Sequence, residues 1–363
     1  MPNIFMVDLA GPEILEEEKE LINHPNVGAL ILFARNFTSS EQLRTLTAAI
    51  HKMRPDIFIA MDHEGGFAQR CLRFEFRALP AARVYGDFYN KNPEAALAMA
   101  KEYGAIMAQD LLAHGVDLSL APVLDLHGIS NVIGKLDRAF HSMPEIVTAL
   151  AKSFIEGMHT AGMPQGVGKH FPGHGSCSLD SHIEKPIHAV SRDELFQKDI
   201  IPFANLIKEK KIAALMPAHI TYPAVDENNA ASFSKVWLQD ILRTELGFDG
   251  LVISDCLSMK GADIGDLPKR STLALEAGCE LLILCNQGCK ATLEVVNAVQ
   301  FTPNSEAVRH LDAFKKQMVR FSDKKNDYQA TSSMIFTKLE EGTASSMQQA
   351  TPSDAGLNKT LSI

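Results

Sequence analysis

Eight short runs of apolar residues recur along the chain, and each is followed by a segment whose apolar residues have helical spacing. The runs are continuous rather than alternating, which is typical of parallel strands covered on both faces. Eight strand–helix units without a break favour an α/β fold of the single (β/α)8 TIM-barrel type over an open doubly wound sheet. No Gly-x-Gly-x-x-Gly follows the first run, which also disfavours a dinucleotide-binding fold. The expected strands are residues 5–8, 28–33, 58–62, 118–123, 166–171, 213–219, 251–255 and 281–286.

The segments between these runs predict the helices. Two of them begin with capping residues, because Ser39 has Gln42 three positions later and Ser191 has Glu194 at the same offset. The stretch between the third and fourth strands is long, and we expect a loop insertion around residues 79–91. The expected helices are residues 40–53, 93–114, 143–161, 191–209, 235–246 and 269–277.

The composition changes near residue 322. Residues 330–363 are rich in Ser, Thr, Gln and Gly and contain few apolar side chains, so they lack the material for a packed core. We therefore predict one barrel domain over residues 1–322, followed by a flexible or loosely docked polar tail over residues 323–363.

Charge and composition exclude several classes of function. The formal net charge of −9 argues against a nucleic-acid binder, which usually carries a basic stripe. The N-terminus lacks the pattern of a secretory leader, and the longest apolar runs are too short to span a bilayer, so no membrane partner is expected. Six cysteines without a Cys-x-x-Cys pair are typical of free thiols in a reducing compartment. We expect a cytoplasmic monomer.

Polar and ionisable residues gather where the predicted strands end. In a barrel the loops that follow the strands converge on one face, and chemistry is found there. Such a concentration is difficult to explain by packing and is the main indication of an enzyme. The strand-end residues are Asp8, Asp62, Lys169, His170, His219, Asp255 and Asn286.

The densest of these segments reads Lys-His-Phe-Pro-Gly-His-Gly over residues 169–175 and is followed by Asp180-Ser181-His182. Its glycines and prolines predict a loop after the strand, so His182 is expected on a mobile segment above Lys169 and His170. Asp180 is close enough in sequence to bond one imidazole nitrogen of His182. That bond would fix the tautomer and raise the basicity of a residue that both donates and accepts a proton.

A metal-binding interpretation uses the same segment. His170, His174, Asp180 and His182 could supply three or four ligands. The His-x-His that metal-dependent barrel hydrolases usually carry at the first strand does not occur in this chain. We therefore expect no metal and no other cofactor, with a metal-dependent barrel hydrolase as the alternative.

Two carboxylates complete the candidate site. Asp255 ends an apolar strand and is placed to attack or stabilise an oxocarbenium-like centre, although it could also cap the following helix. Asp62 ends another strand before Gly65-Gly66, which permits a sharp turn that brings Arg70 back toward the barrel mouth. Such carboxylate and guanidinium groups can bond sugar hydroxyls, whereas Glu64 is as well placed to hold the loop together.

Together with Ala-Pro-Val-Leu-Asp at residues 121–125 and Met-Pro-Ala-His at 216–219, these segments closely resemble the single-domain β-N-acetylglucosaminidases of glycoside hydrolase family 3. Those are peptidoglycan-recycling enzymes of Gram-negative bacteria. The resemblance covers residues 3–286 with the motifs in the same order. It implies a retaining exo-β-N-acetylglucosaminidase that removes terminal GlcNAc from GlcNAc-1,6-anhydroMurNAc peptides, a small carbohydrate substrate, without a cofactor.

The resemblance also implies a role for each matching residue. Asp255 would be the nucleophile, His182 the acid/base and Asp180 its orienting partner. The residues that would hold the terminal sugar are Asp62, Arg70, Arg138, Lys169 and His170.

The chain departs from the family pattern at several positions. The segment around Arg138 is two residues longer, Phe67 stands where Arg is common, Cys256 where many relatives have Asp, and Lys260 where Glu is common. None of these changes removes a group assigned to chemistry, so they bear on substrate preference rather than on activity.

Besides the metal-dependent hydrolase, three further alternatives stay open at this point. The substrate acetamido group could act as the internal nucleophile, or the chain could be a catalytically silent sugar-binding protein. Because a neutral imidazole repels an incoming anion less than a carboxylate does, phosphate could also compete with water as the acceptor.

Overall fold

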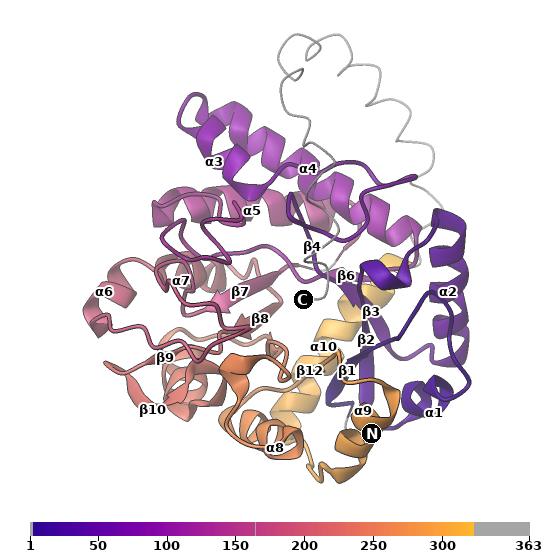
Figure 1. Cartoon of the computed structure of the whole chain (residues 1–363). Helices are drawn as coiled ribbons and strands as arrows, with labels where there is room; N and C mark the ends of the chain where they lie inside the picture. The colour runs from indigo at the N-terminus through magenta and orange to yellow at the C-terminus, as the bar shows by residue number, and fades with distance from the viewer. Residues whose placement is uncertain (1–2, 164, 323–363) are drawn as a thin grey trace.

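The computed structural model describes residues 3–163 and 165–322, in which eight parallel strands form two sheets. Helices lie outside the strands (Figure 1). The larger sheet consists, in spatial order, of β12 (Leu282–Leu284), β1 (Phe5–Asp8), β2 (Val27–Leu32), β3 (Phe58–Met61) and β6 (Leu118–Ser119). The smaller sheet consists of β11 (Leu251–Val252), β8 (Ala214–Pro217) and β7 (Val167–Phe171).

Isolated parallel bridges connect the edges of the two sheets. One joins Val123, which follows β6, to Lys169 in β7. The other joins Ile253, which follows β11, to Leu281, which precedes β12. Each edge strand of the larger sheet is therefore linked to an edge strand of the smaller one.

The helices follow the strands in the order that the sequence predicts. The α-helices are α1 (Glu18–Asn23), α2 (Ser40–Met53), α3 (Ala82–Tyr89), α4 (Pro93–Ala113), α5 (Pro144–Thr160), α6 (Arg192–Gln197), α7 (Ile201–Lys208), α8 (Leu267–Ala277), α9 (Cys289–Ala298) and α10 (Ser305–Ser322). A π-helix, η3, spans Val236–Glu245, and three short 3₁₀ segments are η1 (Ala34–Asn36), η2 (Ala231–Phe233) and η4 (Lys260–Ala262). Two hairpins are β4–β5 (His63–Gly65 and Ala68–Gln69) and β9–β10 (Thr221–Tyr222 and Asp226–Ala230). Over the described residues, no helix combines the length and the apolar character that crossing a bilayer requires.

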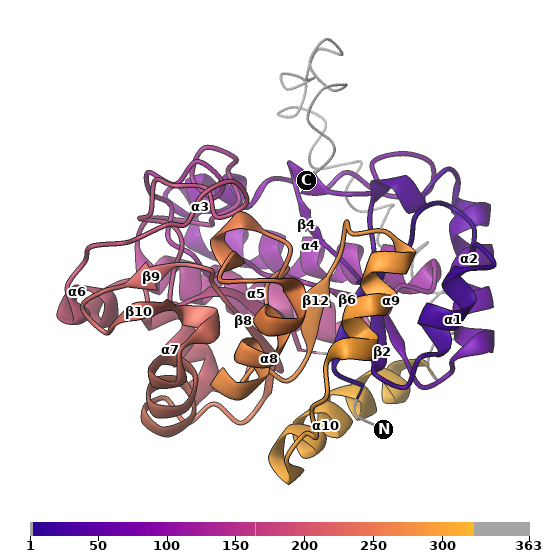
Figure 2. The same cartoon turned by 60° about the horizontal axis from the view of Figure 1, so that its bottom comes forward.

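Side chains on the two faces of the strands form separate clusters. One face packs against the surrounding helices. On the other face, all eight parallel strands contribute to one interior cluster, which includes Met6, Ala60, Val167 and Ile283. Helix α10 runs across one end of the strands (Figures 1 and 2) and adds Phe314 to this cluster, so it covers that end of the interior.

Most predicted elements are confirmed within one to four residues, and α2 has the predicted bounds. Both predicted caps are present, since the hydroxyl oxygens of Ser39 and Ser191 accept hydrogen bonds from the backbone N–H groups of Gln42 and Glu194. Continuous apolar runs predicted the strands correctly because their side chains are buried on both faces.

Two predicted elements differ in the structure. The single helix expected over residues 191–209 is broken into α6 and α7, because Pro202 has no N–H to donate and is tolerated only in the first turn of a helix. The loop expected around residues 79–91 contains helix α3. The predicted tail over residues 323–363 lies outside the described residues.

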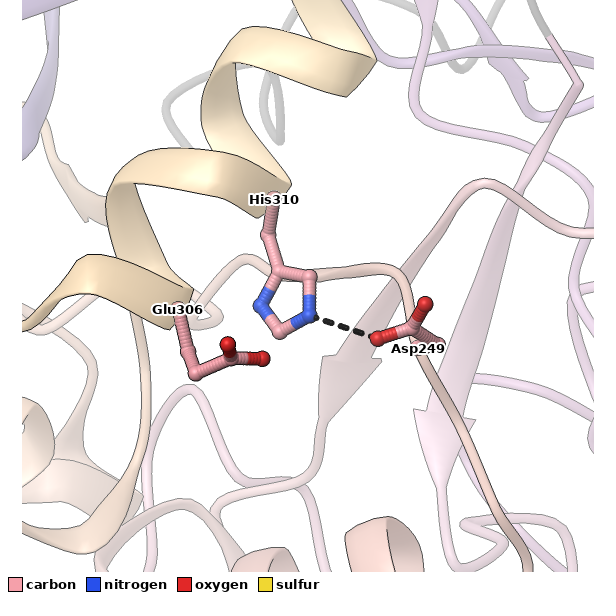
Figure 3. Close-up of side chains that lie close together, drawn as sticks. All are labelled: Asp249, Glu306 and His310. Atoms are coloured by element: carbon pink, nitrogen blue, oxygen red, sulfur yellow. Dashed lines mark hydrogen bonds and ion pairs between the residues drawn. The ribbon is translucent and has the colours of Figure 1, made fainter.

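A buried charge network ties α10 to the N-terminal end of β11. Glu280 accepts hydrogen bonds from Arg243 at 2.9 Å and from the backbone N–H of Val252 at 3.0 Å, and it lies 2.6 Å from Nδ1 of His310. The side chain of His310 is 4% exposed, and its Nε2 is 3.1 Å from Asp249 (Figure 3). Glu280 thus connects a strand end, η3 and α10 through one carboxylate.

Replacing Glu280 with Ala leaves Arg243 and His310 without their shared buried partner. We expect a loss of about 3 kcal/mol in the free energy of unfolding, because removing one partner of a buried pair leaves the other uncompensated. Urea denaturation followed by circular dichroism measures the change. Glu306→Ala is the matched control, since the Glu306 side chain is 65% exposed, and we expect a change within about 0.5 kcal/mol. Equal losses in both variants would contradict the role of Glu280.

Candidate active site

A cavity of about 460 Å³ lies at the C-terminal ends of the strands, and all eight site residues predicted from the sequence line it. Its volume is in the range typical of sites for small molecules. The predicted residues on its wall are Asp62, Arg70, Arg138, Lys169, His170, Asp180, His182 and Asp255. The structure therefore brings together residues from five separate parts of the chain.

A buried cluster of charges forms one wall of the cavity. Nζ of Lys169, whose side chain is 2% exposed, lies 2.7 Å from Asp62 and 2.6 Å from Glu64. Glu64 also accepts two hydrogen bonds from Arg138, at 2.8 and 2.9 Å, in a bidentate arrangement. One carboxylate therefore holds both cations in position, and their geometry is set before any ligand arrives.

These contacts shift the protonation equilibria of the cluster. Burial alone would raise the pKa of Glu64, but the charges and hydrogen bonds of Arg138 and Lys169 hold this pKa well below its usual value. Burial would lower the pKa of Lys169, whereas Asp62 and Glu64 raise it above its usual value. Glu64 and Lys169 are thus charged near neutral pH.

Arg70 is placed by the β4–β5 hairpin, as the sequence predicts. Gly65 and Gly66 make the turn with φ of +100° and +55°, values that favour glycine. An NH2 group of Arg70 lies 3.9 Å from Asp62. Its Nε is buried and has no hydrogen-bond partner among the described residues, and the Arg70 side chain lines the cavity.

Asp125 orients His170 from beneath the cavity. One oxygen of this fully buried carboxylate lies 2.7 Å from Nδ1 of His170. The other accepts backbone N–H groups of His170 at 3.1 Å and of His174 at 2.7 Å. Burial would raise the pKa of Asp125, but His170 and these donors hold it below its usual value. Nδ1–H of His170 therefore donates to Asp125, and Nε2 is the nitrogen left for a ligand.

Asp180 and His182 lie together on the loop that follows β7. Nδ1 of His182 is 2.7 Å from Asp180 Oδ1, which also accepts the backbone N–H of His182 at 2.8 Å. The loop is tied to the segment after β11, since the N–H of Gly261 donates to the carbonyl of Ser181 at 2.7 Å. The side chain of His182 is 32% exposed. Its Nε2 is thus the nitrogen free to exchange protons with a ligand.

Asp255 lies half-buried after β11, and its Oδ1 accepts the backbone N–H of Cys256 at 2.7 Å. Burial would raise the pKa of Asp255, but nearby His219, His170 and His182 lower it below the usual value. The carboxylate is therefore ionised and able to act as a nucleophile.

His219 supports this arrangement from below. Its Nε2 lies 3.1 Å from the carbonyl oxygen of Cys256 and its Nδ1 is 2.6 Å from the hydroxyl of Ser232. Because a carbonyl only accepts, Nε2 carries the proton, and the hydroxyl donates to Nδ1. Burial lowers the pKa of His219, consistent with a neutral ring.

Three residues of the site had no assigned role from the sequence. Asp125 lies two residues beyond the predicted strand 118–123, His219 is one of several residues at predicted strand ends, and the position of Glu64 suits sugar binding and loop stabilisation equally. The sequence around Glu64 does not reveal its ion pair with Arg138, because Arg138 lies 74 positions away. A carboxylate two residues after an apolar run was the available signal for Asp125.

The set of metal ligands considered from the sequence is not brought together. Both ring nitrogens of His174 face hydroxyl groups, those of Ser181 at 3.2 Å and Ser130 at 3.4 Å. Across residues 3–163 and 165–322, the only converging group of three or more potential ligands lies at the opposite end of β11 (Figure 3). There the guanidinium of Arg309 bonds all three members, Asp249, Glu306 and His310.

Two other strand-end residues have a structural role. Asp8 forms an ion pair with Arg35 and accepts the backbone N–H of Asn286 at 2.8 Å. Asp8 thereby fastens the loops that follow β2 and β12 beside the cavity.

Asp199, in the turn between α6 and α7, is buried against the loop that carries His182. It is 3% exposed and its Oδ1 lies 3.5 Å from the hydroxyl of Ser176. A Cβ atom at Gly173 would come within 2.7 Å of the Asp199 side chain, so glycine allows the close approach. Burial and the charge of Asp125 raise the pKa of Asp199 to about 7.

The comparisons with known proteins agree on one family. Residues 3–314 match the model described as "Glycosyl hydrolase family 3 N terminal domain". A beta-hexosaminidase of Aromatoleum aromaticum is 48% identical over 285 residues, 78% of this chain and 79% of the relative. A beta-hexosaminidase of Pseudomonas aeruginosa is 46% identical over 313 residues, 85% and 91% of the two chains.

A solved structure gives the same result. Native NagZ from Neisseria gonorrhoeae matches with a TM-score of 0.79 and 40% identity, covering 86% of this chain and 89% of that one. That protein has also been solved in complex with N-trifluoroacetyl-D-glucosamine.

The raised pKa of Asp199 predicts a pH-dependent stability. Between pH 3.8, the usual pKa, and about 7, the folded state keeps a proton that the unfolded state loses. The contribution of this group to stability is therefore largest below pH 3.8 and falls as the pH rises toward 7. The difference between a pKa of 3.8 and one of about 7 corresponds to about 4 kcal/mol of stability.

Asp199→Asn removes this titration, so we expect the melting temperature of the variant to rise relative to the unmodified protein between pH 5 and pH 8. Thermal unfolding at both pH values measures the difference. Exposed Asp193, changed to Asn, is the control on the neighbouring helix and should show no such trend. A constant difference between Asp199→Asn and the unmodified protein at both pH values would show that Asp199 is not the titrating group.

Proposed function

Because this chain belongs to glycoside hydrolase family 3, we propose that it is a retaining exo-β-N-acetylglucosaminidase with Asp255 as nucleophile and His182 as acid/base. The observation that carries the proposal is that Asp255 and His182 line the same cavity. Asp255 is an ionised carboxylate that follows a strand, and His182 is a loop imidazole hydrogen-bonded to the carboxylate of Asp180. The cavity is also lined by Lys169, Arg138 and Arg70, whose cationic groups can donate hydrogen bonds to sugar hydroxyls.

We also propose that the two sheets form one closed (β/α)8 barrel. The support is threefold: the parallel bridges at both sheet edges, the interior cluster shared by all eight strands, and the cover that α10 provides at one end. In such a barrel the strand ends that carry Asp62, Lys169 and Asp255 surround one opening.

In the first chemical step, the carboxylate of Asp255 attacks the anomeric carbon of the terminal sugar. The protonated Nε2 of His182 donates its proton to the departing glycosidic oxygen, and a covalent glycosyl-enzyme forms. Asp180 stabilises the imidazolium through Nδ1–H. The buried cluster of Asp62, Lys169, Glu64 and Arg138 holds the sugar hydroxyls, so the reacting atoms stay aligned.

In the second step, neutral His182 takes a proton from water, and the water attacks the anomeric carbon and releases Asp255. The Gly- and Pro-rich loop over residues 172–182 moves during turnover to bring His182 to the substrate and to release the product. The neutral imidazole also admits phosphate in place of water, with a sugar 1-phosphate as the product.

The proposed substrate is a GlcNAc-1,6-anhydroMurNAc peptide from cell-wall turnover, processed by a cytoplasmic monomer in peptidoglycan recycling. The family resemblance supports this choice. The complex of the Neisseria gonorrhoeae relative with N-trifluoroacetyl-D-glucosamine supports an N-acylated glucosamine in the terminal subsite. Product analysis on this muropeptide, including the anomeric configuration of the released sugar, tests the substrate and the retaining outcome together.

A 5-fluoro N-acetylglucosaminyl fluoride should trap the covalent intermediate on Asp255. The 5-fluoro substituent slows both chemical steps, whereas the activated fluoride leaving group restores the rate of the first step only, so the intermediate accumulates. Peptide mass spectrometry of the trapped protein then identifies the labelled residue. Label on another residue would refute Asp255 as nucleophile, and the absence of any adduct would favour attack by the substrate acetamido group.

His182→Ala should lower kcat/KM by about 10²- to 10⁴-fold on substrates with poor leaving groups, the usual contribution of a general acid. With a dinitrophenyl leaving group, which departs without a proton, formation of the intermediate should be nearly unaffected. Pre-steady-state release of dinitrophenol separates the two steps. Equal losses on both substrates would contradict the acid role. Sensitivity of the unmodified protein to a chelator would favour the metal-dependent alternative.

A further inference from the structure

Two cysteines meet in the wall of the cavity beside Asp255. Cys256 follows β11 and Cys285 follows β12, and both line the cavity. Their sulfur atoms are 3.4 Å apart. Neither thiol has a role in the proposed hydrolysis, so their proximity needs a separate explanation.

Backbone hydrogen bonds hold the two segments that carry these cysteines side by side. The N–H of Leu257 donates to the carbonyl of Ile283 at 2.9 Å, and the N–H of Ser254 donates to that of Leu281 at 2.8 Å. Neighbouring strands lie about 4.8 Å apart, which is within the range of Cα separations that disulfides span. A disulfide requires the two sulfur atoms to close from 3.4 Å to about 2.05 Å.

The two thiols differ in exposure and in pKa, as expected of a reactive cysteine and the cysteine that resolves its oxidised form. Cys256 is partly exposed, and hydrogen bonds from Cys285 and Ser258 lower its pKa despite burial. Cys285 is buried, and the bond to Cys256 together with burial raises its pKa well above the usual value. Cys256 is therefore the better nucleophile, and Cys285 is the neighbour that can resolve its oxidised form.

The remaining four cysteines lack this combination. Burial raises the pKa values of Cys71, Cys177, Cys279 and Cys289.

We propose that Cys256 and Cys285 form a reversible disulfide in the presence of a peroxide, and that this bond switches the neighbouring active site off. The thiolate of Cys256 attacks one oxygen of hydrogen peroxide, and the O–O bond breaks to give a sulfenic acid and, after protonation, water. The sulfur of Cys285 then attacks the sulfenyl sulfur, and its proton joins the departing hydroxide, which leaves as a second water. Two thiols and one hydrogen peroxide thus yield one disulfide and two waters, with the peroxide oxygens reduced.

The effect on activity follows from the position of Cys256 and rests on the proposed function. Its backbone N–H donates to Asp255 at 2.7 Å, and its sulfur now lies 3.1 Å from the hydroxyl of Ser258. Forming the disulfide draws this sulfur from Ser258 toward Cys285 and shifts the donor that orients the carboxylate. Because a misplacement of about 1 Å can cost about a hundredfold in rate, a loss of at least tenfold is expected.

The experiment exposes the reduced, full-length protein to hydrogen peroxide and follows two independent measurements. Mass spectrometry should show the loss of two hydrogen atoms and a cross-linked peptide pair containing Cys256 and Cys285. Hydrolysis of a chromogenic N-acetylglucosaminide should fall at least tenfold and return with dithiothreitol. If the hydrolytic activity itself were absent, the cross-link would still report on the disulfide, so the two proposals fail separately.

Three variants sharpen the test, each compared with its own reduced activity. Cys285→Ala should form no cross-link, and dimedone should capture the sulfenic acid on Cys256. Cys256→Ser should give neither product and serves as a second variant if Cys285→Ala fails to fold. Cys289→Ser, outside the pair, should behave as the unmodified protein. The absence of the cross-link, or an unchanged dithiothreitol-reversible loss in Cys285→Ala, would overturn the proposal.

Discussion

The ammonium group of Lys169, buried between Asp62 and Glu64, is the interaction on which the architecture of the site depends. A charge on a side chain only 2% exposed is tolerable only with partners of opposite charge in good geometry. Glu64 in turn requires Arg138, so one chain of ion pairs links β3, β4 and β7 to the segment before α5. A displacement that separated these elements would leave a buried charge unpaired, which is costly.

The opposite ends of the strands have different tasks. Glu280 and His310 form the buried network at the N-terminal end of β11, where α10 covers the interior and stability is gained. At the C-terminal ends, the ionisable groups contact one another and also line a cavity. This division is typical of barrels, in which loops at the C-terminal ends of the strands can vary without disturbing the core.

The cavity combines groups that follow strands with groups carried by a loop. The carboxylate of Asp255 belongs to a strand end and is oriented by a backbone donor, whereas His182 belongs to a loop rich in glycine and proline. Asp125 and Asp180 each orient one histidine of the site. Asp125 accepts Nδ1–H of His170 and Asp180 accepts Nδ1–H of His182, so in both rings Nε2 is left for a ligand. Cys256 adds a redox-sensitive group to the segment that also positions Asp255.

The sequence by itself determined the order of strands and helices, because continuous apolar runs and capping serines act locally. It also determined the residue types at the strand ends, and through the family motifs it identified all eight predicted residues that line the cavity. The broken helix at Pro202 was readable in principle, but helix α3 was not separable from a loop by pattern alone. Only the tertiary structure decided which carboxylate pairs with which cation, and that Glu64 forms ion pairs with both Arg138 and Lys169. It also decided that the thiols of Cys256 and Cys285 lie in contact. These pairings join residues tens of positions apart, so their geometry depends on how strands align in space and not on spacing along the chain.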